Sequence, residues 1–431
     1  GCPFEVRKLR PPTELDWLLD RDMDIARSLA DSESYLLHLD VEYVNFDSPA
    51  EAFTDPWRSF ELQEPVVKAI EKLLLSWAIQ PLHLITGQGH HFVWRIGRSS
   101  EVAAKIRALC PAPELTDLCM QRIPPILAGH IQTDEQETFS ALALLMEYTA
   151  HRVKALATAE TKIPIKLTAV HVGPGATGRR EIISIDVSEY GDPLHTRMIR
   201  MPFTYYLKPW VTGLAKSLGV DGEIPAFCSI PLHEMDFRQA IKVRQVERDV
   251  VDLAGRACVR IPLQEEGTSC LLEDYLASRL RRFHEYYYSA QHDPKERWPE
   301  TYDRTPLTSL PQCVRHLLEC PNDLLLKPAG IQLVTRTLLS QNWHPRHIAG
   351  LIRSKFENPG FGWGIRWDDY EAATRADFYT RLFAGQLSAG LDHLVDFNCT
   401  SNREKGFCFL SENCNDNLEA ARQRLLSQIP L

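Results

Sequence analysis

The sequence predicts an α+β fold, with a sheet-containing N-terminal part and a mainly α-helical C-terminal part. Strand-like runs and helical patterns mix in the first half of the chain without regular βαβ alternation. From about residue 235 onward, helix-period runs dominate and strand-like runs nearly vanish. A chain of 431 residues is long enough for two or three domains with substantial cores.

The N-terminal elements are predicted from their hydrophobic periodicity. In chain order we expect a helix, a buried strand, a helix, a β-hairpin, two helices and a second hairpin, over 13–30, 35–44, 62–79, 82–96, 99–108, 134–157 and 166–187. Glycines mark both hairpin turns, at 87–90 and at 173–178. Further along, a proline-rich break at 289–312 is the best linker candidate in the helical part.

Composition and charge exclude some classes of protein. The formal net charge of −9 argues against a protein that coats nucleic acid non-specifically, although a local basic groove is compatible with it. No apolar run approaches the roughly 18 residues that span a bilayer, and the first residues lack the pattern of a signal peptide. We therefore expect a cytoplasmic protein without a membrane partner.

The run His-Leu-Asp-Val-Glu-Tyr at 38–43 places two carboxylates on the first predicted strand. Successive side chains of a strand alternate between its faces, so Asp40 and Glu42 point the same way. Apolar neighbours indicate that the strand is buried, and a buried acid pair is costly unless it binds metal or is hydrogen-bonded. The pair is therefore a candidate metal clamp, with a solvated strand end or structural ion pairs as the alternatives.

Three further segments carry candidate site residues. In the first hairpin turn, Gly87, Gln88 and Gly89 allow close approach of a ligand, and His91 can reach a phosphate; the alternative is a plain tight turn. Asp186 ends the strand at 181–187 and offers a third carboxylate for a two-metal site, or else begins the next turn. The last segment supplies cations for a triphosphate, or ordinary surface charges: Arg197, Arg200 and Lys208.

In this order, the four motifs resemble the catalytic domain of the archaeo-eukaryotic primase and primase-polymerase superfamily. The resemblance covers about 35–210, and Tyr206 stands where that family is expected to have histidine. It implies an RRM-like mixed sheet within 1–230 that holds two Mg²⁺ or Mn²⁺ ions. The implied metal ligands are Asp40, Glu42 and Asp186, with His91 as a further catalytic residue that contacts the nucleotide, and the implied nucleotide contacts are Gly87, Gln88, Gly89, His91, Arg197, Arg200 and Lys208.

Cysteines suggest a second centre near the C-terminus. Of eleven cysteines, Cys313 and the later trio Cys399, Cys408 and Cys414 make four thiolates, enough for a [4Fe-4S] cluster or a zinc site, although free thiols remain an alternative. The absence of a C-x-x-C pair weakens zinc. With Gly330 to Leu333, these residues resemble the iron-sulfur domain of the primase large subunit. The implied division is a catalytic domain, a helical connector and an iron-sulfur domain, at 1–230, 231–305 and 306–431.

These resemblances together imply a DNA primase-polymerase: a metal-dependent nucleotidyltransferase that makes or extends primers on single-stranded DNA from NTPs or dNTPs. A helicase or another replication protein is the further partner they imply. Two rival hypotheses stay open at this stage. One is a non-catalytic replication or defence module that binds nucleic acid and senses redox state, and the other is a two-metal nuclease.

Overall fold

A computed structural model gives the fold. It describes residues 10–127, 129–321, 323–361, 363, 370–409 and 417–428, with only the backbone of Ile126 and Asp323. The predicted α+β class is confirmed, because the structure combines 53% helix with 11% strand in a mixed sheet. Among the described residues, no helix has both the length and the apolar character needed to cross a membrane.

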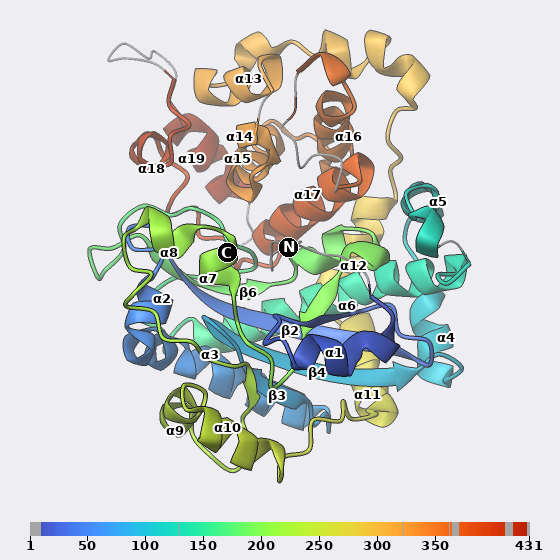
Figure 1. Ribbon diagram of the computed structural model, residues 1–431. Coiled ribbons are helices and arrows are strands. Elements are labelled where there is room, and N and C mark those ends of the chain that lie inside the picture. Colours follow the sequence, from blue (N-terminus) through green and yellow to red (C-terminus); the bar gives the residue numbers. More distant parts are fainter. Residues whose placement is uncertain are drawn as a thin grey trace.

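The main sheet has six strands, and β2 lies in its middle between β6 and β4 (Figure 1). In spatial order the strands are β5 (Ile165–Lys166), β6 (Glu181–Asp186), β2 (Ser34–Asn45), β4 (Gly89–Gly97), β3 (Leu82–Ile85) and β8 (Ile230–Pro231). All neighbours are antiparallel except β5 and β6. A second sheet pairs β1 (Ala26–Ser28) with β7 (Met198–Arg200) in antiparallel orientation.

Helices surround the sheet and form the C-terminal half. Those up to residue 288 are α1 (Leu15–Leu19), α2 (Glu51–Thr54), α3 (Pro56–Ser76), α4 (Glu101–Arg107), α5 (Pro113–Gln121), α6 (Thr133–Ala157), α7 (Lys208–Val211), α8 (Leu214–Ser217), α9 (Phe237–Val243), α10 (Glu247–Ala254), α11 (Glu265–Leu276) and α12 (Arg279–Tyr288). The later ones are α13 (Gln312–Glu319), α14 (Asp323–Leu326), α15 (Pro328–Leu339), α16 (Pro345–Phe356), α17 (Ala372–Ser388), α18 (Cys399–Glu404) and α19 (Glu419–Gln428).

Short 3₁₀ helices connect these elements. They are η1 (Pro12–Glu14), η2 (Pro125–Leu127), η3 (Ser188–Gly191), η4 (Leu194–Thr196), η5 (Lys295–Glu300), η6 (Tyr302–Arg304), η7 (Leu307–Ser309) and η8 (Pro359–Phe361). Three of them, η5 to η7, occupy the predicted linker at 289–312. Trp298 and Tyr302 are buried there, and the Tyr302 hydroxyl lies 3.1 Å from His347 Nδ1 on α16, so this segment is packed against the C-terminal helices.

The alternation along β2 separates an apolar face from a polar one. Leu37, Leu39 and Val41 are completely buried on the first face. Helix α3 covers this face, since Phe60 packs edge-on against His90, the residue opposite Val41. The residues between them in sequence point to the other face. Burial of one face therefore determines which side chains of β2 are left for chemistry.

Two sequence predictions about the fold are wrong. The helix predicted over 13–30 ends at Leu19, because Asp22 adopts a positive φ of 52° and the chain then pairs as β1 with β7. The second predicted hairpin does not form, since β5 runs parallel to β6 and comprises two residues. The apolar side chains after β5 that suggested a strand are buried, but their backbone belongs to no strand: Leu167, Val170 and Val172.

The C-terminal helices gather above the sheet in Figure 1, and α17 makes the main contact with the N-terminal half. It packs against η3 and α5, and a Cβ atom on Gly191 would come within 2.6 Å of the Phe378 ring. One cluster of buried apolar residues extends from Leu29 to Leu425. The two halves thus share a core, and the three-domain division stays a prediction.

Candidate active site

Three adjacent strands bring the predicted acids and one histidine onto the same face of the sheet. Asp40 on β2 is paired with His91 on β4 and with Asp186 on β6. Residues directly opposite each other share a face, and Glu42 joins them because it follows Asp40 by two positions. His90 lies on the other face, opposite Val41, as the alternation predicts. Three separate motifs of the sequence therefore meet at one place.

The carboxylates in this row repel one another. Burial raises the pKa of Asp40 well above its usual value, and the charges of Glu42, Asp186 and Glu189 raise it further. Burial also raises the pKa of Asp186, although the Ser188 backbone N–H, which donates to Asp186 Oδ1 at 2.8 Å, opposes this shift. Four acids at one site leave a negative excess that a bound cation would relieve.

Unpaired polar atoms also face this site. Within the described part of the chain, buried Asp40 Oδ1 has no hydrogen-bond partner, although His91 Nε2 lies 3.4 Å away, and His91 Nδ1 has none either. Burial and the neighbouring His38 lower the pKa of His91 well below its usual value, so its imidazole is neutral near pH 7. A neutral imidazole offers one donor and one acceptor, and an unpaired carboxylate oxygen is a ready ligand for a hard cation.

The donor set fits a Mg²⁺ or Mn²⁺ ion in chemistry, but its side chains are not arranged around a common point. Among the described residues, no three His, Cys, Asp or Glu side chains come close enough together to hold a metal ion as they stand. Glu42 is turned toward Lys208, with Oε1 3.5 Å from Nζ. Metal binding would therefore require Glu42 to exchange this contact for the ion.

Sequence reasoning missed two members of the cluster, Glu189 and His38. Both carboxylate oxygens of Glu189 lie 2.9 Å from His38 Nδ1, and the His38 ring meets His91 edge-on at 4.6 Å. The signal for His38 was present, because strand alternation places it on the same face as Asp40. Glu189 had no such signal, since it stands in η3 and its direction depends on the turn after Asp186.

The three predicted cations have different partners in the structure. Lys208 is next to the acid pair, and its pKa is raised chiefly by Glu42. Arg197 instead forms an ion pair with Asp192, and Arg200 forms one with Asp24. Of the three, only Lys208 contacts a predicted metal ligand in this structure.

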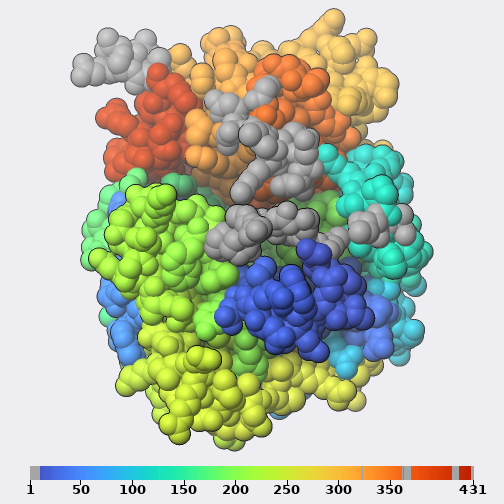
Figure 2. All heavy atoms as spheres, in the orientation of Figure 1, coloured from blue at the N-terminus to red at the C-terminus, as the bar shows by residue number. Residues whose placement is uncertain are grey.

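The N-terminal segment holds Arg200 in place. Asp24 binds both Arg200 and the backbone N–H of Leu207, the latter at 3.0 Å, and the guanidinium lies over the Tyr206 ring at 4.3 Å. Figure 2 shows the same proximity, with the blue segment around α1 beside the green segment that includes α7 and α8. A phosphate could therefore reach Arg200 only in competition with Asp24.

The glycine-rich turn is closely packed by the protein itself. A Cβ on Gly89 would lie 1.7 Å from the Val41 carbonyl oxygen, and one on Gly87 would lie 2.2 Å from the Tyr206 ring. The Gln88 carbonyl accepts hydrogen bonds from Tyr43 N–H and from the Gln63 side chain, at 3.0 and 3.1 Å. Packing thus explains both glycines, and a nucleotide-binding role for Gly87, Gln88 and Gly89 stays a prediction.

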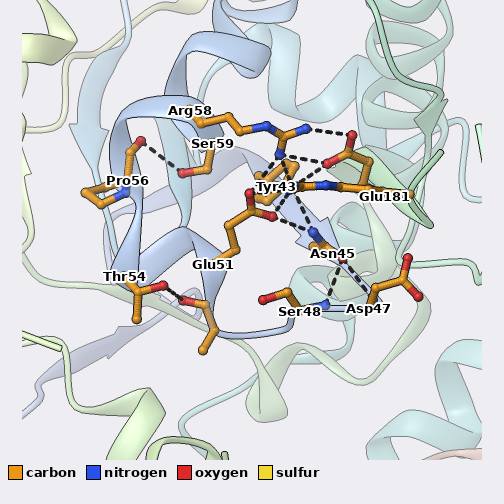
Figure 3. Close-up of polar contacts among 12 residues, drawn as sticks. Tyr43, Asn45, Asp47, Ser48, Glu51, Thr54, Pro56, Arg58, Ser59 and Glu181 are labelled. Atoms are coloured by element: carbon orange, nitrogen blue, oxygen red, sulfur yellow. Dashed lines mark hydrogen bonds and ion pairs between the residues drawn. The ribbon is translucent and has the colours of Figure 1, made fainter. Parts of the chain in front are cut away.

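Tyr43, on the same face of β2 as Val41, belongs to a polar network that connects β2 with β6. Tyr43 Oη lies 2.7 Å from Glu51 Oε2 and 2.5 Å from Glu181 Oε2 (Figure 3). Arg58 on α3 binds both acids, Glu51 at 2.9 Å and Glu181 at 2.8 Å. Because Glu181 begins β6, these contacts help to hold Asp186 beside Asp40 at its other end.

Parts of the predicted cysteine centre also lie together. On α18, Cys399 and Asn402 share a helix face, and Asn402 Nδ2 donates to Cys313 Sγ on α13 at 3.3 Å. Burial, together with the nearby Cys399, raises the pKa of the Cys313 thiol to about 11, although the hydrogen bond from Asn402 opposes this shift.

The chain next to Cys408 reaches the same helix. The Phe409 ring packs on His316 of α13, with ring centroids 3.9 Å apart. His316 follows Cys313 by three positions and so lies on the same face of α13. The fourth predicted ligand, Cys414, lies outside the described residues. Cys313 and Cys399 are thus neighbours, with the Cys408 segment against the same helix.

Comparisons with protein-family models, with curated proteins and with solved structures found no match for this chain.

The repulsion at Asp40 gives a pH prediction for the metal-free protein. A carboxyl whose pKa is raised on folding stabilises the protein fully below its unfolded pKa of about 3.9, and this contribution is lost as the pH rises through the folded pKa. Asparagine does not titrate, so Asp40→Asn does not lose this contribution. The free energy of unfolding of the variant should therefore fall less than that of the wild type as the pH rises. Urea unfolding in EDTA across the pH range measures both slopes; the exposed Asp252→Asn is the control. If the free energy of unfolding changed equally with pH in Asp40→Asn and in the wild type, the raised pKa of Asp40 would be refuted.

Proposed function

We propose that the protein is a metal-dependent nucleotidyltransferase that synthesises or extends primers on a DNA template. The observation that carries the proposal is the convergence of Asp40, Glu42 and Asp186 on one sheet face, with Lys208 beside Glu42. Three carboxylates suit a divalent-metal centre, and an adjacent lysine suits the phosphates of an incoming nucleotide.

Each residue has a distinct part in this proposal. Asp40, Glu42 and Asp186 would hold Mg²⁺ or Mn²⁺, and the metal would supply Lewis-acid activation of a 3′-hydroxyl and charge neutralisation of the triphosphate. Lys208, released from Glu42 when that carboxylate turns to the ion, would bind the phosphates. His91, as a neutral imidazole, would donate one N–H to a phosphate oxygen.

The two arginines need a change of partner to take part. Arg200 must leave Asp24 and Arg197 must leave Asp192 before either contacts a triphosphate. Phosphate competes well with a carboxylate for a guanidinium, because both accept paired N–H donors. Their nucleotide-binding role therefore belongs to the bound state of the enzyme.

Incorporation of nucleotides tests the proposal. Protein purified without oxygen is incubated with single-stranded DNA, labelled NTPs or dNTPs, and Mn²⁺, Mg²⁺ or EDTA, with and without a primer. We expect template-dependent products with either metal and none in EDTA. Template binding without incorporation under every condition would instead favour the non-catalytic module, and strand cleavage would favour the nuclease.

For the second centre we propose a [4Fe-4S] cluster, with zinc as the alternative, held by Cys313, Cys399, Cys408 and Cys414. The support is the proximity of Cys399 to Cys313 and of the Cys408 segment to α13. Thiolates that lie close together are the ligands of an iron-sulfur cluster or of a zinc ion. Association with a helicase or another replication protein stays part of the same proposal.

Cysteine substitution tests the second centre. We expect protein purified anaerobically to carry iron and broad visible absorbance, and Cys313→Ser to lose both, because serine does not replace a thiolate ligand. Cys320→Ser is the matched control, since Cys320 is exposed beyond the end of the same helix. Bound zinc without iron would select the alternative metal, and equal metal content in both variants would contradict the ligand assignment.

A further inference from the structure

A cleft of about 940 Å³ opens between the two halves of the chain, apart from the candidate active site. The end of α6, strand β5 and the loop 172–175 form one wall. The end of α17 and the residues up to Glu404 in α18 form the other. Its volume is within the usual range for small-molecule sites.

Lys154 lies in this cleft, and no carboxylate of the described residues is in contact with it. Its side chain is almost completely buried, and Nζ donates to one neutral group, Gln386 Oε1, at 2.9 Å. Burial, and then the positive charge of Lys166, lower the pKa of Lys154 to about 7. A buried lysine without a counter-charge destabilises the protein, and a bound anion would stabilise its charged form.

The nearby acids are already matched by other cations. Asp392 binds Arg336 through two contacts, at 2.8 and 2.7 Å. Asp396 contacts the same arginine at 3.1 Å and Lys405 Nζ at 2.6 Å, and Lys166 Nζ is 3.8 Å from it. Including Lys154, four cations therefore share two buried carboxylates, and the floor of the cleft has a positive excess.

The other charged and polar groups of the cleft leave room for an anion at Lys154. Glu404 and His393 also line it, but both are exposed to solvent. Thr400 and Ser401 also line it with hydroxyl groups, and Asn398 lines it with an amide that caps α18 and donates to the Val395 carbonyl. Hydroxyls and amides that line the same cleft as an ammonium group can donate to the several acceptor oxygens of an oxyanion.

We infer that this cleft binds a small phosphate-bearing anion, with Lys154 as its charge partner. The phosphate would be free inorganic phosphate or the phosphate group of a nucleotide. This site is independent of the proposed carboxylate centre, because none of the described lining residues belongs to that centre. Binding therefore needs no divalent metal.

Calorimetric titration in EDTA tests the site with inorganic phosphate and with adenosine monophosphate. We expect saturable binding of at least one of them to the wild type and a loss of roughly tenfold or more in affinity in Lys154→Met, as for a lost charge-assisted contact. The exposed Lys162→Met should bind as the wild type does. Tighter binding of the nucleotide would identify the nucleotide as the source, and equal affinity would identify free phosphate. No saturable binding to the wild type, or equal binding to Lys154→Met, would overturn the inference.

Thermal unfolding separates this role from a structural one. Without anion, Lys154→Met should melt above the wild type, because it removes a buried amine that contacts no charged partner among the described residues. Phosphate should raise the melting temperature of the wild type and leave that of the variant unchanged. A lower melting temperature for Lys154→Met, with no effect of phosphate on the wild type, would show that Lys154 is structural. If Lys154→Met does not fold, Lys166→Gln serves in the same titration, and wild-type affinity in that variant would count against the inference.

Discussion

Asp40→Asn is expected to lower nucleotide incorporation by about 10³-fold, the scale of losing a preorganised electrostatic contact to a transition state. Asp40 is central in the row of strands, opposite both His91 and Asp186. An amide has no charge with which to hold a divalent ion, yet it occupies the same space as the carboxyl group. Single-turnover incorporation with saturating template measures the loss.

The control for this substitution is Asp252→Asn, which makes the same chemical change at an exposed position on α10. Its rate should equal that of the wild type. Because Asp40→Asn removes repulsion among acids, the metal-free variant should also unfold at no lower urea concentration than the wild type. A rate within about tenfold of the wild type would be too small a loss for a metal ligand and would contradict the proposed role.

Arg381→Met is expected to reduce the free energy of unfolding by about 3–5 kcal/mol, as for a buried ion pair with one partner removed. Arg381 Nε donates to Glu147 Oε2 at 2.9 Å, and its Nη1 donates to the Tyr288 hydroxyl at 2.7 Å. Both ends of the pair are almost completely buried, and the pair joins α17 to α6. The substitution therefore leaves the Glu147 carboxylate buried without its main counter-charge.

The pH dependence of this effect follows from Glu147. Burial alone would raise its pKa, but Arg381 and His284 outweigh burial and lower the pKa to about 2. A lowered carboxyl pKa adds stability above the unfolded value of about 4.3, and this stability is lost as the pH falls toward 2. The deficit of Arg381→Met should thus be largest near neutral pH.

Urea unfolding of Arg381→Met beside Arg282→Met provides the measurement. Arg282 is exposed on α12, so its loss should cost less than about 0.5 kcal/mol. Equal stability of the two variants at pH 7 would mean that the Glu147 pair does not join the two halves of the protein as the structure indicates.

Local sequence patterns sufficed to predict the central part of the site. Alternation along β2 fixes the common face of Asp40 and Glu42, and the glycine-marked hairpin brings His91 to the same face. The pairing of β6 with β2 places Asp186 on the same face as Asp40. This pairing is a long-range contact that the hydrophobic periodicity of the sequence does not predict. For this part the prediction rested on the order of motifs and on the family resemblance.

The surroundings of the site depend on contacts that no local pattern reports. The pair of Arg200 with Asp24 joins residues far apart in the sequence and depends on the strand β1 inside the predicted helix. The pair of Arg197 with Asp192 depends instead on how the chain turns through η4. Equally, the parallel pairing of β5 and the position of Glu189 depend on how the chain turns after each strand. Local patterns therefore placed Asp40 and Glu42 on one face but did not give the partners of the two arginines.

Manganese binding tests most directly whether Asp40, Glu42 and Asp186 form one metal centre. Electron paramagnetic resonance would follow free Mn²⁺ as it is titrated into metal-free wild type and into Asp186→Asn. We expect saturable binding by the wild type and an affinity weaker by roughly tenfold or more in the variant, since changes around a metal centre have effects of this size. Wild-type protein that leaves Mn²⁺ free, or Asp186→Asn with unchanged affinity, would contradict the metal centre and with it the proposed nucleotidyl transfer.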